Sequence, residues 1–202
     1  MRTKKFLFCL LACLLGSCVP IMSLHPLLDE KSVVFDEKLL GTWVEDPNIT
    51  WEFSRAEEPT NAYKLIYTLQ EKEGGKEKVI KGLFIVGLGK LKDNLFLDVC
   101  PAPWEQQDPN KIEWAFNTLL LIPAHTFIKI DSTKPQIKML RTDDEKMKEF
   151  LKANPDAVKH TVLEDKPVLT ASTNELQEFV LKYADDKRVF AVESVLTRKT
   201  NK

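Results

Sequence analysis

Three side chains of this sequence have the chemistry of a nucleophilic site. Cys100 carries a thiol, His125 carries an imidazole that could act as its base, and Asp98 carries a carboxylate that could orient the imidazole. No motif places them together, and a cysteine that ends a strand is more often a buried packing residue. We therefore interpret Cys100 as packing and His125 as a donor to a backbone carbonyl. The sequence predicts no enzyme, and an envelope hydrolase or isomerase that uses His125 is the alternative.

Residues that could bind a metal or a phosphate are scattered along the chain. His25, His125 and His160 lie far apart, whereas a zinc site needs several ligands that converge. The acidic run 143–145 is expected at a helix start, where carboxylates favour the positive end of the helix dipole. No glycine-rich phosphate loop occurs in the sequence. We expect neither a metal nor a cofactor.

The overall composition excludes two broad classes of protein. The 202 residues include 29 basic and 30 acidic side chains, and three of the basic ones lie among the first 17 residues. The remainder is net acidic, which argues against a nucleic-acid partner, because such proteins need a surplus of Lys and Arg. An apolar content of 44% argues against intrinsic disorder.

The N-terminus has the three parts of a secretory signal. A basic head is followed by the apolar run 6–15 and by small residues, and this run is too short to cross a bilayer. Its end, Leu-Gly-Ser-Cys at 15–18, resembles the lipobox of bacterial lipoproteins. The resemblance implies cleavage after residue 17 and a diacylglycerol thioether on Cys18. A competing match ends at Cys13, and an ordinary secreted protein is the alternative.

The lipobox implies an address in the cell envelope. Residues 1–17 would be the signal peptide, 18–35 a lipidated tether and 36–202 the folded domain. The membrane is then a partner through the lipid, and Val19 resembles an outer-membrane signal of some Gram-negative lipoproteins. After cleavage and acylation only Cys100 keeps a free thiol, so no disulfide within the chain is expected.

Short runs typical of β-strands alternate with turn signals in most of the predicted domain. The clearest run is 62–70, where Tyr63, Leu65 and Tyr67 fall on one face, as a half-buried strand requires. Glycines predict a turn at 74–75 and a break at 87–89. One helical turn is expected at 36–39, and the remaining strands at 41–44, 50–54, 78–86, 94–99, 125–130, 136–141 and 189–198.

Two later segments have the pattern of helices. Thr142 and Glu145 are spaced as a capping box, as are Ser172 and Glu175. The second helix has an apolar stripe at 176, 179, 180 and 183. Strands first and helices later predict a mainly β fold, an antiparallel barrel or strongly curved sheet with two C-terminal helices against it.

The first predicted strand carries a motif of three residues. Gly41-Thr-Trp43 resembles the Gly-x-Trp motif of lipocalins and related calycin barrels, and Arg198 matches the basic residue that lies over the tryptophan in that family. Stretches 39–43, 94–98, 123–127 and 169–176 are also similar to an uncharacterised group of bacterial lipocalin-like lipoproteins. The resemblance implies a lipocalin-like barrel and no established chemistry.

A barrel suggests a cavity, and aromatic residues are the candidates to line it. A core filled by the same side chains is the alternative. The segment 101–122 is too long for a plain connection, so we expect it at the mouth of a pocket. The candidate ligand-binding residues are Trp51, Phe53, Tyr63, Tyr67, Phe84, Phe96, Trp104, Trp114, His125 and Phe127.

The expected function is therefore non-catalytic binding by a lipid-anchored extracytoplasmic protein. The ligand would be a small apolar or amphipathic molecule or an envelope protein. A purely structural envelope lipoprotein is a further alternative. The sequence does not specify the ligand, the partner or the oligomeric state.

Overall fold

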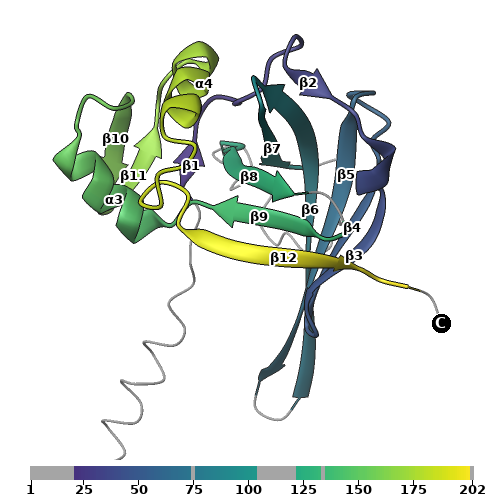
Figure 1. Cartoon of the computed structure of the whole chain (residues 1–202). Helices are drawn as coiled ribbons and strands as arrows, with labels where there is room; N and C mark the ends of the chain where they lie inside the picture. The colour runs from purple at the N-terminus through teal and green to yellow at the C-terminus, as the bar shows by residue number, and fades with distance from the viewer. Residues whose placement is uncertain (1–20, 74–75, 104–121, 133–134, 201–202) are drawn as a thin grey trace, which may run out of the picture.

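A closed β-barrel forms the larger part of the molecule (Figure 1). The computed structural model describes residues 21–73, 76–103, 122–132 and 135–200. Within them, antiparallel strands follow one another in the order β6-β5-β4-β3-β12-β9-β8-β7, and β7 pairs with β6 to close the barrel. The predicted mainly β fold is confirmed. The eight strands are β3 (Gly41–Asp46), β4 (Ile49–Arg55), β5 (Ala62–Glu73), β6 (Lys76–Leu91), β7 (Asn94–Pro101), β8 (Thr126–Ser132), β9 (Ile137–Arg141) and β12 (Val192–Arg198).

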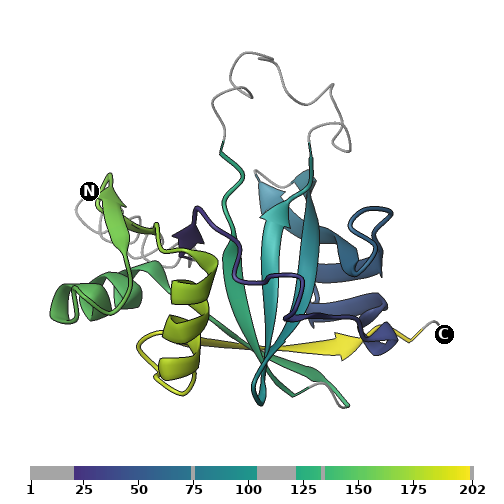
Figure 2. The same ribbon diagram turned by 90° about the horizontal axis from the view of Figure 1, so that it is seen from above.

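A small lobe packs against the outer wall of this barrel (Figure 2). Its sheet has the order β1-β11-β10, with β1 (Met22–Ser23) parallel to β11 (Lys166–Leu169) and β10 (His160–Leu163) antiparallel to β11. The hairpin of β10 and β11 was missed from the sequence. Two helices complete the lobe, α3 (Asp144–Ala153) and α4 (Thr173–Lys182). Neither of these described helices is long and apolar enough to cross a membrane.

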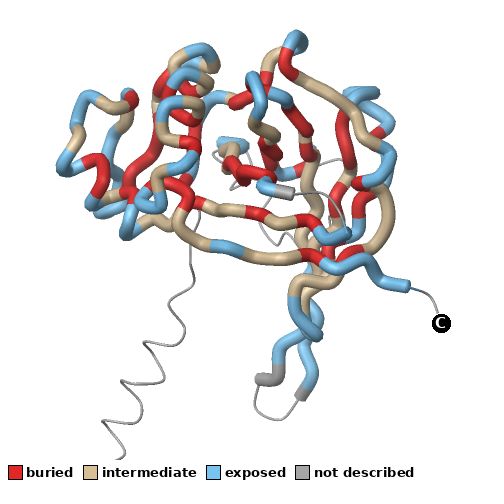
Figure 3. The backbone as a smooth tube through the Cα atoms, viewed as in Figure 1, coloured by how far each residue is buried: buried red, intermediate tan, exposed pale blue. Residues whose placement is uncertain are grey.

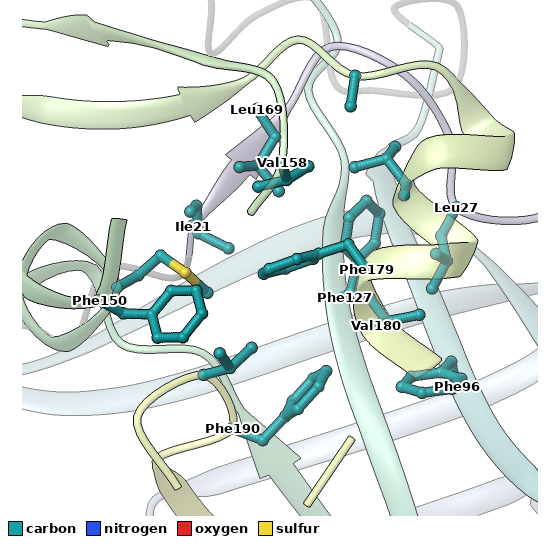
Figure 4. Close-up of a cluster of buried hydrophobic side chains, with 14 of the residues drawn as sticks. Ile21, Leu27, Phe96, Phe127, Phe150, Val158, Leu169, Phe179, Val180 and Phe190 are labelled. Carbon is teal, nitrogen blue, oxygen red and sulfur yellow. The ribbon is translucent and has the colours of Figure 1, made fainter. Parts of the chain in front are cut away.

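Among the described residues the buried apolar side chains form two clusters, one inside the barrel and one between its outer wall and the small lobe. Buried segments accordingly occur both in the barrel strands and in the small lobe (Figure 3). Alternate residues of a strand point to opposite faces, so Leu97 and Val99 of β7 fill the barrel. Phe96 of β7 and Phe127 of β8 point outward and pack against α4 and its neighbours (Figure 4). The prediction that Phe96 and Phe127 line the barrel cavity was therefore wrong, because both faces of these strands are covered.

The predicted break at 87–89 is also wrong. Strand β6 continues through these residues to Leu91, and the turn follows at Lys92, whose φ is +52°. Gly89 is needed for packing instead, because a Cβ at this position would collide with the side chain of Leu28. The glycines let another segment cross β6 at close range.

That segment is the N-terminal strap, which we define as residues 21–35. It was predicted as a tether, but it is folded onto the molecule over its described length. Ile21 and Leu27 are buried in the core of the small lobe, and β2 (Val33–Val34) pairs with β6. The backbone N–H of Ile21 also donates to Thr142 Oγ1 at 3.1 Å. The strap thus joins the lobe to the barrel.

In the Gly-x-Trp motif Trp43 lies beneath Arg198, as the resemblance implied. Trp43 is buried, and its Nε1–H donates to the carbonyl of Leu39 at 2.8 Å. The guanidinium carbon of Arg198 lies 4.3 Å from the centre of the Trp43 ring, and Arg198 donates to the carbonyls of Leu40 and Lys38. Gly41 has φ +111°, and a side chain there would collide with Arg198. A 3-10 turn, η1 (Glu37–Leu39), leads into this motif as predicted.

The two predicted helix caps have different outcomes. At α4 the predicted capping box is present, and the Glu175 carboxylate accepts a hydrogen bond from the backbone N–H of Ser172. At α3 the N-cap is Asp143, which accepts from the N–H of Lys146, and not Thr142. The hydroxyl of Thr142 is instead the acceptor for Ile21 in the strap.

Candidate functional site

Aromatic side chains pack against one another in the described part of the barrel interior. Tyr63 stacks on Phe35 with ring centres 4.5 Å apart, and Phe53 meets the Tyr63 ring edge-on. Trp51 and Tyr67 are in edge contact at 5.3 Å. The Tyr63 hydroxyl is also engaged, because it accepts from the N–H of Asp36 and donates to its carbonyl. These candidate ligand-binding residues serve as core, and an adjoining cavity measures only about 30 Å³.

A larger hollow of about 170 Å³ lies on the outer wall of the barrel, beside the strap. The strands expose their outward residues to it, because the inward residues Val86, Leu97 and Val99 belong to the barrel core. Its lining is mostly apolar, with three side chains that can do chemistry. The lining residues are Leu28, Val33, Pro59, Asn61, Ala62, Ile85, Gly87, Asp98, Cys100 and His125.

His125 is held by Asp98 at the edge of this hollow. The Nδ1 atom of His125 lies 2.7 Å from Oδ1 of Asp98, which is buried in the wall. The other oxygen of Asp98 accepts from the N–H groups of Leu27 and Leu28 in the strap, at 2.7 and 3.4 Å. The expected hydrogen bond from the His125 ring to a backbone carbonyl is therefore replaced by a bond to a carboxylate.

The pKa of His125 follows from two opposing effects. Burial disfavours the charged imidazolium, but the hydrogen bonds with Asp98 and with the Cys100 side chain outweigh it and raise the pKa from 6.5 to about 10. His125 therefore carries a positive charge at neutral pH. Since Nδ1 is directed to Asp98, the Nε2–H group is the donor that remains for Cys100 or for a ligand.

Strand register explains why Cys100 joins this pair. Val99 of β7 lies opposite Thr126 of β8. The next position along each strand therefore places Cys100 opposite His125. Asp98 is two residues before Cys100 and shares its face of β7. A thiol, an imidazolium and a carboxylate thus meet in an apolar hollow, although 27 positions separate Asp98 from His125 in the chain.

The backbone of His125 is fixed as well as its ring. Its N–H and carbonyl exchange hydrogen bonds with Ser23 of the strap, both at 2.9 Å. The strap therefore holds both Asp98 and His125, a role that the sequence analysis missed. The available signal was Asp98 itself, a charged residue within the otherwise apolar run 95–100.

The structure brings together only some of the predicted site residues. Trp51, Phe53, Tyr63, Tyr67 and Phe84 belong to the barrel core, and Phe96 and Phe127 lie in the core of the small lobe. Among the described candidates His125 alone lines the hollow. The predicted pocket residues Trp104 and Trp114 and the predicted lipid site Cys18 lie outside the described residues.

The chain matches no family model, no curated protein and no solved structure. The closed antiparallel barrel, with Trp43 beneath Arg198 at one end, is consistent with a calycin-like fold.

Proposed function

We propose that this protein is an extracytoplasmic lipoprotein, anchored through Cys18, that binds a small amphipathic ligand without catalysis. The observation that carries the binding role is the hollow over Asp98 and His125, since the described part of the barrel interior is packed. The lipobox at 15–18 supports the anchor. The cell envelope, with the outer membrane favoured by Val19, is the proposed location.

The hollow suits one end of a small amphipathic molecule. Its apolar walls, including Leu28, Val33 and Ile85, would cover a short hydrocarbon chain. The Nε2–H group of a positively charged His125 would donate to an oxygen of the ligand. Ligand pockets usually measure about 300–1,000 Å³, so a hollow of about 170 Å³ fits only a short chain or one side chain of an envelope partner.

The anchor is tested by removing the thiol. Because two or more acyl chains bind a bilayer far more firmly than one, we expect the wild-type protein in the membrane fraction and Cys18→Ala in the soluble fraction. Intact mass should show the acyl chains on the wild-type chain alone. The matched control is Cys100→Ala, which should stay in the membrane fraction. A wild-type chain that lacks acyl chains would contradict the proposed anchor.

The binding site is tested with hexanoate as the probe. A ligand of this size should bind with a Kd of roughly millimolar order. We expect NMR signals of Ile85 and Cys100 to shift on titration with hexanoate. His125→Gln should weaken the binding at least about fivefold, as expected for the loss of a charged donor. His160→Gln is the control, because the His160 ring bonds to the carbonyl of Val158, away from the hollow. Equal binding by both variants would rule out the site.

A second candidate function is acyl transfer, favoured by the meeting of Cys100, His125 and Asp98. The Cys100 thiolate would attack an ester carbonyl, form a thioester and release the alcohol, and water would then release the acid. We rank this second because the backbone N–H groups of Leu27 and Leu28, which could otherwise stabilise an oxyanion, already bond to Asp98. The ester p-nitrophenyl hexanoate decides between the two. A thioester at Cys100 with continued turnover, absent in His125→Gln, would favour the enzyme.

A further inference from the structure

Large apolar side chains are exposed on the small lobe, beside the start of the strap. Val162 and Leu163 of β10 are 57% and 58% exposed. Met22 of β1 and the nearby Leu24 are also exposed, although less so. These four residues, which we call the lobe patch, belong to the sheet β1-β11-β10 or directly follow one of its strands.

The end of the β10–β11 hairpin is uncovered on both sides. Val162 and Leu163 are neighbours in a strand, so their side chains point to opposite faces. A hairpin that packs on a core hides one face, but here both apolar side chains are exposed. The hairpin then turns at Glu164 and Asp165, which have φ values of +46° and +70°. The end of the hairpin thus carries an exposed apolar side chain on each face, next to a turn of two acidic residues.

Strand direction places the proposed anchor at this same end of the sheet. Because β1 is parallel to β11, the N-terminal end of β1 points towards the end of β11 that begins at the turn. Ile21 is fixed there by its bond to Thr142 and by burial. Ile21 comes three positions after Cys18, and a fully extended chain of three steps spans only about 10 Å. A lipid on Cys18 would therefore hold the hairpin close to the bilayer.

We propose that the lobe patch docks on the bilayer that holds the lipid anchor, with Val162 and Leu163 entering the headgroup region. This inference rests on the proposed acylation of Cys18. Apolar side chains at the boundary of the headgroups and acyl chains gain by leaving water. The charges nearby are mixed: Lys166 pairs across from Leu163, and Asp165 bonds to Lys148 at 2.8 Å. The burial of these apolar side chains and the short chain between Cys18 and Ile21 thus determine how the domain is oriented on the bilayer.

The test uses the full-length lipoprotein, purified and reconstituted into vesicles of phosphatidylethanolamine and phosphatidylglycerol. An environment-sensitive nitrobenzoxadiazole label is attached to Leu163→Cys in a Cys100→Ser background. The matched control carries the label at Ile80→Cys, because Ile80 is also exposed, at 40%. Ile80 lies on the β5–β6 hairpin, which projects from the barrel well away from the small lobe (Figure 1). Both proteins are compared in vesicles and in detergent-free buffer after enzymatic removal of the acylated end.

We expect the emission of the label at 163 to rise several-fold on vesicles and to be quenched by brominated lipids, with little change at 80. Intact mass of the same samples reports the acyl chains. If the chains are present and both labels behave alike, docking is overturned while the anchor stands. If the chains are absent, the proposed anchor is wrong and the docking inference falls with it.

Discussion

Replacing Trp43 with alanine is expected to lower the free energy of unfolding by about 3–5 kcal/mol. The side chain is buried in the barrel core, so its removal leaves a cavity that the paired strands β3 and β12 cannot collapse to fill. It also leaves the Leu39 carbonyl without its donor and Arg198 without the ring beneath it. Denaturant unfolding followed by circular dichroism, in a Cys18→Ala background that needs no detergent, measures this change.

Two milder variants separate the contributions around Trp43. Trp43→Phe keeps an aromatic ring and loses the Nε1–H donor, so we expect a smaller loss of about 1–2 kcal/mol. Arg198→Lys keeps the charge and loses the planar group over the ring, for which we expect about 1 kcal/mol or less. A Trp43→Ala protein that is as stable as Trp43→Phe would show that the cavity term is absent.

Replacing Asp98 with alanine is expected to lower the free energy of unfolding by about 3–5 kcal/mol. The change leaves the buried N–H of Leu27 without an acceptor and the His125 imidazolium, whose side chain is only 20% exposed, without its counter-charge. We expect the strap to loosen from the wall, so amide hydrogen exchange at Leu27 and Leu28 should accelerate. The control is Asp185→Ala, since Asp185 also pairs with a buried cation, Lys129, but is itself exposed. If the free energy of unfolding fell by several kcal/mol in Asp185→Ala and stayed unchanged in Asp98→Ala, this account would be contradicted.

The pair of Asp98 and His125 makes the free energy of unfolding depend on pH. The pKa of His125 is about 10 in the folded state and about 6.5 when unfolded, so its stabilising effect is complete below about pH 6.5 and is lost as the pH rises to about 10. Asp98→Asn removes the counter-charge while keeping the shape, and burial should then return the pKa towards or below 6.5. The wild-type protein should therefore lose more stability than this variant between about pH 6.5 and 10.

Much of the barrel could be predicted from the sequence because its strands have a distinct inner face. In β5 the inward Tyr63 and Leu65 alternate with more exposed residues, and this signal is local. The capping box of α4 is equally local. Strand β7 is different, because the small lobe covers its outer face. Apolar and polar residues then no longer alternate along β7, so the pattern does not show which residues point into the barrel. For this reason Phe96 was assigned to the wrong core.

The strap and the site could not be predicted, since their partners are remote in the chain. Residues 21–35 contain Pro26 and no periodic pattern, and they acquire structure from contacts with remote segments such as β6, β7, β11 and α4. The meeting of Cys100 with His125 depends on which strands pair and in which register. Neither the pairing of these strands nor their register can be inferred from the residue types. Only the chemical complementarity of Asp98, His125 and Cys100 was visible.

The strap also determines the order in which the chain can complete its fold. Ile21 bonds to Thr142, and the carbonyls of Pro26 and Leu27 accept from Thr173 and Gln177, contacts that span 121 to 150 positions. The first folded residues to leave a ribosome or cross a membrane thus find their partners only after most of the chain has followed. Long-range contacts of this kind slow folding. The site over Asp98 and His125 is therefore assembled late, when both ends of the chain are in place.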